Sequence, residues 1–182
     1  MKPRVIALAL FAAPFVLAAD AAQPSDSRHT RATARLRPAT PAVRAMVEDA
    51  IERSATVRAL VHEIAASDLI VYVESGRTAP PAIATTRLVT STARVRYLRI
   101  TIDAMTAPNG FVPLFAHELQ HAVEIARSPD VRDAESMRTL YARIGQNTRE
   151  TMTFETDAAQ AAERRARAEG LAARVTRRPM RY

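Results

Sequence analysis

Apolar residues recur along the first half of the chain with helical spacing. From Pro41 to about residue 65 they return every three or four positions, as on one face of a helix. They form two stripes that meet at Ser54. Ser54 could cap a second helix, or it could simply interrupt one long helix.

Strand patterns follow this helical region. Residues 68–75, with the sequence DLIVYVES, are rich in β-branched and aromatic residues. In residues 93–103 the side chains alternate, and the pattern puts Val95, Tyr97 and Arg99 on one face and Arg96, Leu98, Ile100 and Ile102 on the other. Arginines that alternate along a strand suit an edge strand or a face exposed to solvent. Residues 86–92 are a third strand candidate.

Helical spacing then returns over residues 112–127, 130–144 and 154–172. Asp130 is placed to cap the second of these helices, and Gly145 is placed to end it. The order of helix, strands and further helices predicts an α+β fold with a small, mostly antiparallel sheet.

The first residues have the pattern of a secretory signal. Lys2 and Arg4 precede an apolar run from Val5 to Ala18, which small residues follow. This run is shorter than the roughly 20 residues that span a bilayer, so we expect export to a periplasm or to the cell exterior, with no stable membrane span after cleavage. The expected parts are a signal peptide (1–21), a flexible lead-in (22–40), one domain (41–175) and a basic tail (176–182).

The composition limits which metal sites and which partners the chain can have. The chain has no cysteine, so any metal site must use His, Asp and Glu, and zinc fingers and iron–sulfur clusters are excluded. The formal net charge is +7, and Lys2 is the only lysine. Acidic residues are interspersed with the arginines through most of the chain, so we expect no nucleic-acid partner. Such binding would require the arginines to gather on one face.

The most informative motif is His117-Glu118-Leu119-Gln120-His121. Residues four apart lie on the same face of a helix, so His117 and His121 can direct both imidazoles at one zinc ion. From the next position, Glu118 can take a proton from zinc-bound water and pass it to a leaving amine. A second His-Glu pair, at His62, has no histidine four residues later and is expected to lie at the surface.

On this motif the chain resembles the zincin metallopeptidases, in which the motif lies on an active-site helix beneath a small sheet. The metzincin branch continues it with Gly and His, where this chain has Glu124 and Arg127. The gluzincin branch takes a glutamate from a later helix as its third ligand, and Glu155 stands at the expected start of the last helix. Gluzincins often carry an acidic residue four positions after that ligand, where this chain has Ala159.

Glu124 is the alternative third ligand. It follows His117 by seven residues on the same helix face, but the three groups would span about 10 Å along one straight helix. Alternatively, Glu124 could hold the His121 ring in position without binding the metal itself. Tyr97, Tyr141 and the arginines of strand 93–103 are candidates for stabilising an oxyanion, and that strand is our choice for pairing with an extended substrate.

Together these features predict an exported zinc peptidase of gluzincin type that acts on a peptide or protein. Its zinc ligands would be His117, His121 and Glu155, and its general base would be Glu118. The alternative is a non-catalytic exported domain that keeps the zincin scaffold, with or without metal, to bind a partner. The absence of an acidic residue at Ala159 favours the alternative, and the presence of Glu118 opposes it.

Overall fold

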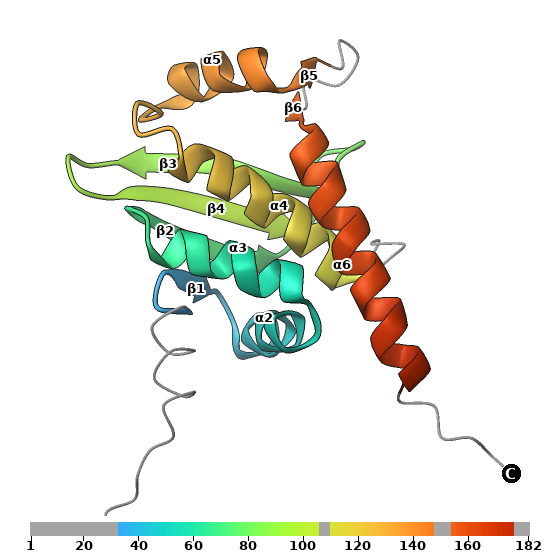
Figure 1. The fold of residues 1–182 in the computed structure, drawn as a ribbon. Coiled ribbons are helices and arrows are strands. Elements are labelled where there is room, and N and C mark those ends of the chain that lie inside the picture. The colour runs from blue at the N-terminus through green and yellow to red at the C-terminus, as the bar shows by residue number, and fades with distance from the viewer. Residues whose placement is uncertain (1–32, 106–109, 148–153, 177–182) are drawn as a thin grey trace, which may run out of the picture.

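A four-stranded sheet with helices across one face organises the chain (Figure 1). The computed structural model describes residues 33–105, 110–147 and 154–176. The expected signal peptide, most of the expected lead-in and nearly all of the basic tail lie outside the described residues. The elements are β1 (Leu36–Pro38), α2 (Pro41–Arg53), α3 (Ala55–Ala65), β2 (Leu69–Ser75), β3 (Ala84–Ser91), β4 (Arg96–Ile102), α4 (Phe111–Ala126), α5 (Ala134–Ile144), β5 (Gln146–Asn147), β6 (Phe154–Glu155) and α6 (Asp157–Thr176).

The sheet is mixed, with the strand order β1-β2-β4-β3. β1 pairs parallel to β2 and β2 pairs parallel to β4, while β3 pairs antiparallel to β4. The α+β class is therefore confirmed, but the expectation of a mostly antiparallel sheet is wrong. The chain reaches β2 from β1 through two helices, and such helical crossovers join parallel strands. β1 lies inside the segment expected as a lead-in, and its Leu36 is buried.

Local capping explains why α2 and α3 are separate helices. Thr40 accepts a hydrogen bond from the Val43 amide at the start of α2, and Pro41 occupies the first turn. Ser54 ends α2 and accepts a hydrogen bond from the Val57 amide, so it caps α3. Of the two alternatives for Ser54, the structure has the cap.

One face of the sheet and the helices above it form the core. The alternating side chains of β2 and β4 that face the helices are fully buried: Leu69, Val71, Val73, Leu98, Ile100 and Ile102. α3 and α4 lie side by side across this face, and α6 crosses α4 (Figure 1). α4 is buried around most of its circumference, because it packs on the sheet, on α3 and on α6.

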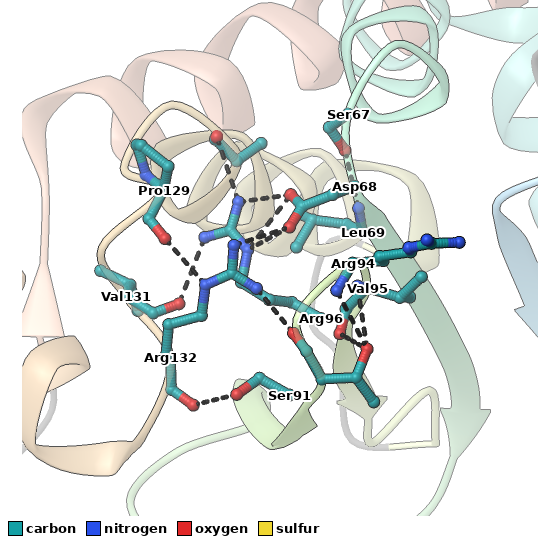
Figure 2. A network of polar contacts seen from close by, with 12 residues as sticks. Ser67, Asp68, Leu69, Ser91, Arg94, Val95, Arg96, Pro129, Val131 and Arg132 are labelled. Carbon is teal, nitrogen blue, oxygen red and sulfur yellow. Dashed lines mark hydrogen bonds and ion pairs between the residues drawn. The ribbon is translucent and has the colours of Figure 1, made fainter.

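Arg96 is a fully buried arginine at the start of β4 (Figure 2). Its guanidinium donates to both carboxylate oxygens of Asp68 at 2.6–3.1 Å. It also donates to the carbonyl oxygens of Ile125 at 2.7 Å and Ser128 at 2.8 Å. These carbonyls lie at the C-terminal end of α4, where a helix lacks internal partners and favours positive charge. Arg96 therefore anchors α4 to the sheet, and exposure to solvent was the wrong expectation for this arginine.

The C-terminal elements differ from the sequence expectation at their boundaries. Asp133, not Asp130, caps α5, and its side chain accepts a hydrogen bond from the Ser136 amide. Gly145 follows the last residue of α5, as expected. Glu155 lies in the short strand β6, just before α6 rather than in its first turn. Within the described ranges, no helix has the length and apolarity needed to cross a membrane.

Candidate metal centre

α4 brings the two histidines of the motif together. His117 and His121 are one helical turn apart, and their Nε2 atoms lie 3.1 Å from each other. The helix begins after Gly110, whose φ of 81° lies in the left-handed region that glycine adopts without strain. Gly110 thus allows the backbone to enter α4, which carries both rings, in a conformation that other residues rarely adopt.

Glu155 joins the histidines from β6. Its Oε2 lies 3.3 Å from His117 Nε2, and one ligand atom from each of His117, His121 and Glu155 lies within 4.8 Å of the other two. Zinc ligands at about 2.0–2.1 Å in a tetrahedron are separated by roughly 3.3 Å. The observed separations of 3.1 and 3.3 Å match two of those edges, and the third lies within 4.8 Å, so the three residues can hold a zinc ion.

Glu124 lies on the opposite side of His121 from this cluster. Its Oε2 is 2.9 Å from His121 Nδ1, and its Oε1 accepts a hydrogen bond of 2.7 Å from the Thr156 hydroxyl. Both oxygens are therefore engaged away from the Nε2 atoms. This is the position of a residue that orients a metal ligand rather than one that binds the metal.

Glu163 of α6 holds His117 in the same way and is not among the site residues expected from the sequence. Its Oε2 lies 3.3 Å from His117 Nδ1, and its Oε1 pairs with Arg167. The resemblance to gluzincins directs attention to Ala159, which is fully buried where α6 packs on α4. Glu163 lies one helical turn beyond Ala159 on the same face, so extending the search by one turn would have found it.

The two carboxylates determine the tautomers of the rings. An ionised carboxylate only accepts hydrogen bonds, so Nδ1 of each histidine must carry the proton that faces Glu163 or Glu124. In the neutral rings both Nε2 atoms then present lone pairs to each other across 3.1 Å. Two facing lone pairs and the nearby Glu155 carboxylate repel one another unless a cation lies among them. A metal ion, or a proton on one Nε2, would relieve this repulsion, so the donor set is suited to a cation.

The pKa of His121 shows that its surroundings favour positive charge. Burial by itself would lower the pKa of His121, but its hydrogen bond to the Glu124 carboxylate and the charges of Glu118 and Glu155 outweigh burial, so the pKa is raised above the usual value. The imidazoles are only 10% and 8% exposed, whereas Glu155 is 34% exposed. The site therefore opens to solvent on the Glu155 side.

Glu118 lies beside the cluster and is held by the sheet. The Thr86 hydroxyl of β3 lies 2.7 Å from Glu118 Oε2 and 3.2 Å from its backbone carbonyl oxygen. Burial raises the pKa of the Glu118 carboxyl despite the histidines and Thr86, which act in the opposite direction. The sequence carries no signal for Thr86, because the contact depends on where β3 pairs in the sheet.

Two further expectations about the site are changed by the topology. β4 lies between β2 and β3, so it has no free edge for a substrate, and choosing strand 93–103 for substrate pairing was wrong. β3 is the edge strand beside Glu118. Tyr141 is buried, and its hydroxyl donates to the His121 carbonyl at 3.2 Å. Burial, followed by the charge of Glu124, raises the Tyr141 pKa, so this phenol remains protonated.

Comparisons with known proteins give no relative to interpret this site. The chain matches no protein-family model, no curated protein and no solved structure. The function is therefore inferred from the side chains themselves.

Proposed function

We propose that this chain is an exported zinc-dependent peptidase with Glu118 as its general base. His117, His121 and Glu155 would hold the zinc ion. The observation that carries the proposal is the arrangement of donor atoms: two Nε2 atoms and one carboxylate oxygen lie within 4.8 Å of one another, while both Nδ1 atoms face carboxylates. Resident catalytic zinc typically has three such protein ligands and an open fourth position.

The residues around the centre supply the rest of the chemistry. A zinc ion in this site would act as a Lewis acid that polarises a peptide carbonyl and makes water a stronger nucleophile. Glu118 would accept a proton from that water and deliver it to the leaving amine. Its raised pKa makes it a stronger base than an exposed glutamate. Thr86 engages Oε2, and no described residue bonds Oε1, which can then face the water.

The edge strand β3 suits an extended peptide substrate. Among the described residues, no strand pairs with its outer side, and Thr86 connects it directly to Glu118. A peptide that adds to β3 through main-chain hydrogen bonds would lie beside the proposed base. This strand replaces β4 as our candidate for substrate pairing.

A non-catalytic metal-binding domain is the second candidate function. Its support is the position of Tyr141, whose hydroxyl donates to a main-chain carbonyl of α4 rather than pointing to an open site. A purely structural metal site would have no use for Glu118, and this glutamate favours the peptidase.

Metal content of the purified full chain tests the centre. We expect one zinc per chain by mass spectrometry, lost in His121→Ala and kept in His62→Ala, which removes an exposed histidine from α3. Equal zinc in the two variants would contradict the proposed site.

The general base is tested separately from the metal. Glu118→Gln should keep the zinc and abolish hydrolysis of an unfolded protein substrate such as casein. The same substitution at exposed Glu135 should leave the zinc content and the hydrolysis of casein unchanged. An unmodified chain that binds zinc but cleaves neither casein nor a peptide library would favour the non-catalytic domain.

The third ligand has its own test. Glu155→Ala removes a proposed ligand, whereas Glu124→Ala removes only the partner of His121 Nδ1. We expect Glu155→Ala to lose zinc during gel filtration and Glu124→Ala to retain it with lower affinity. If Glu155→Ala kept its zinc and Glu124→Ala lost it, Glu124 would be the third ligand and Glu155 would not.

A further inference from the structure

The face of the sheet opposite α3 and α4 carries a row of arginines. The strand register aligns Arg37 of β1 with Tyr72 of β2, Tyr72 with Arg99 of β4, and Arg99 with Arg87 of β3. Residues paired in this way point to the same side of a sheet. All four side chains are exposed, including Tyr72 at 41% and Arg99 at 50%.

A pair of tyrosines lies within this surface, which we call the arginine face (Arg37, Tyr72, Arg87, Tyr97 and Arg99). Tyr72 and Tyr97 have ring centroids 6.5 Å apart and planes 24° from parallel. They come from adjacent strands, β2 and β4. The face thus combines cationic groups with aromatic rings on a rigid scaffold.

The charge of the arginine face is largely uncompensated. Glu74 is the acidic residue of β2 that points to this side, and it lies 3.8 Å from Arg99. The Arg37 guanidinium donates to the carbonyl oxygen of Leu36 at 3.0 Å. Among the described residues, Arg87 has neither a hydrogen bond nor an ion pair through its side chain. Within the four strands, three positive charges on this face therefore accompany one negative charge, and an anionic partner would be attracted.

We propose that the arginine face binds single-stranded nucleic acid. Arginines across the strands would neutralise phosphates, and the tyrosine rings would stack on unpaired bases, which expose the π-faces that a duplex hides. An anionic lipid surface is less suited, because the row offers tyrosines and arginines rather than protruding aliphatic side chains. In the sequence these arginines lie among acidic residues, and the sheet register alone gathers them on one side.

This inference is independent of the proposed metal centre. The centre lies on α4 and β6, and α4 packs on the face of the sheet that buries Leu98 and Ile100, whereas the arginines alternate with these residues and lie on the opposite face. Loss of one function should therefore leave the other intact.

Salt-dependent binding of a fluorescein-labelled 12-nucleotide oligothymidylate to the full chain, followed by fluorescence anisotropy, tests the phosphate contacts. The logarithm of the affinity should fall with the logarithm of salt concentration by about 0.7 for each phosphate neutralised on a single strand. We expect Arg37→Gln/Arg87→Gln/Arg99→Gln to flatten this slope by about 2 and to weaken binding at least tenfold at low salt.

A matched triple variant controls for net charge. Arg138→Gln/Arg143→Gln/Arg164→Gln changes exposed arginines of α5 and α6. It should lower the net charge as much as the first triple variant does, but leave the dependence of binding affinity on salt concentration unchanged. Equal losses in the two triple variants would mean that total charge, not the arginine face, attracts the oligonucleotide, and the proposal would be wrong.

The stacking contacts are tested with a 12-nucleotide abasic strand of the same charge. It should bind at least fivefold more weakly than oligothymidylate, and Tyr72→Ala should remove most of that difference, since stacking contributes about 1–3 kcal/mol per base. Equal affinity for oligothymidylate, the abasic strand and heparin would overturn the proposal by showing a general polyanion surface. Tighter binding to anionic vesicles than to oligothymidylate would overturn it in favour of a lipid surface.

Discussion

The two imidazoles of the centre are positioned by carboxylates from different parts of the chain. His121 faces Glu124 on its own helix, whereas His117 faces Glu163 on α6. The first contact is local, and the second requires α6 to pack across α4. Side chains behind a metal ligand hold the ring orientation and raise the basicity of the ligand.

Substitution of Glu163 should weaken zinc binding without unfolding the protein. We expect Glu163→Ala to lower zinc affinity about 10- to 100-fold, because His117 loses the acceptor for its Nδ1 proton. Glu163→Gln keeps an acceptor oxygen and should fall between Glu163→Ala and the unmodified chain. Competition with a chromogenic chelator measures the affinity.

A control for this prediction is Glu135→Gln, which removes an exposed carboxylate of α5 that is not one of the Nδ1 partners of the two rings. It should bind zinc like the unmodified chain. If Glu163→Ala bound zinc equally well, the contact at 3.3 Å would have no role in the centre.

The protein should lose stability in acid as Asp68 becomes protonated and its interaction with Arg96 weakens. The hydrogen bond from Arg96 holds the pKa of this carboxyl below its ordinary value of 3.8. A depressed folded-state pKa contributes stability above the unfolded-state pKa, and this contribution is lost as the pH falls through the folded-state pKa. Asp68→Asn should therefore reduce the free energy of unfolding at pH 7 by about 2 kcal/mol and flatten its decline below pH about 4.

Urea unfolding between pH 2.5 and 7 measures this effect. Asp49→Asn is the matched control, because Asp49 pairs with Arg53 at the surface of α2, where ion pairs contribute about 0–1 kcal/mol. The role given to Asp68 would be refuted by identical pH profiles for Asp68→Asn and the unmodified chain.

At the scale of elements, α6 supports the start of α3 as well as the metal centre. Glu169 of α6 accepts a hydrogen bond of 2.6 Å from the Ser54 hydroxyl and one of 2.8 Å from the Thr56 hydroxyl. Burial opposes the charged form, but these bonds and the Thr56 amide outweigh it and lower the Glu169 pKa. A helix N-terminus favours such a negative charge.

Removal of either partner of this cap should destabilise the fold. We expect Ser54→Ala and Glu169→Ala each to lower the free energy of unfolding by about 1–2 kcal/mol. The double variant should lose less than the sum of the single losses, because the side chains share a hydrogen bond. Additive losses in urea unfolding would show that the 2.6 Å contact contributes no coupling energy.

Strand β4 shows what sequence periodicity can predict and what it cannot. The alternation over β4 correctly separates its buried residues, among them Leu98 and Ile100, from Tyr97 and Arg99. It cannot place β4 in the centre of the sheet, because strand order is set by pairing between distant segments. For the same reason Arg96 appeared exposed, although its partners Asp68 and Ile125 lie about 30 residues away on either side.

At the scale of the whole molecule, a zinc ion would connect α4 to β6 and so restrain segments that are distant in sequence. A ligand that binds only the folded state stabilises it by about 2.7 kcal/mol at 100 times its Kd. For a chain of this size, that corresponds to a rise in Tm of roughly 5–10 °C.

Thermal unfolding followed by circular dichroism checks this stabilisation. Zinc should raise the Tm of the unmodified chain and of His62→Ala, and a chelator should reverse the change. His121→Ala should show no rise. A similar rise in His121→Ala would mean that zinc stabilises the protein at some other place.

The sequence by itself determined the features that depend on neighbouring residues. Helical periodicity places His117, Glu118 and His121 together, and local hydrogen bonds make Ser54 a cap and Gly145 a helix end. These depend on the geometry of one or two helical turns, which a short stretch of residues specifies.

Only the tertiary structure decided which distant groups meet at the centre and on the sheet. Glu155, Glu163 and Thr86 reach the α4 motif from β6, α6 and β3, and their positions depend on packing between elements and on strand register. The arginine face likewise exists only because three pairings align its residues. Packing and register are set by the burial of the whole core, so no single stretch of the sequence contains them.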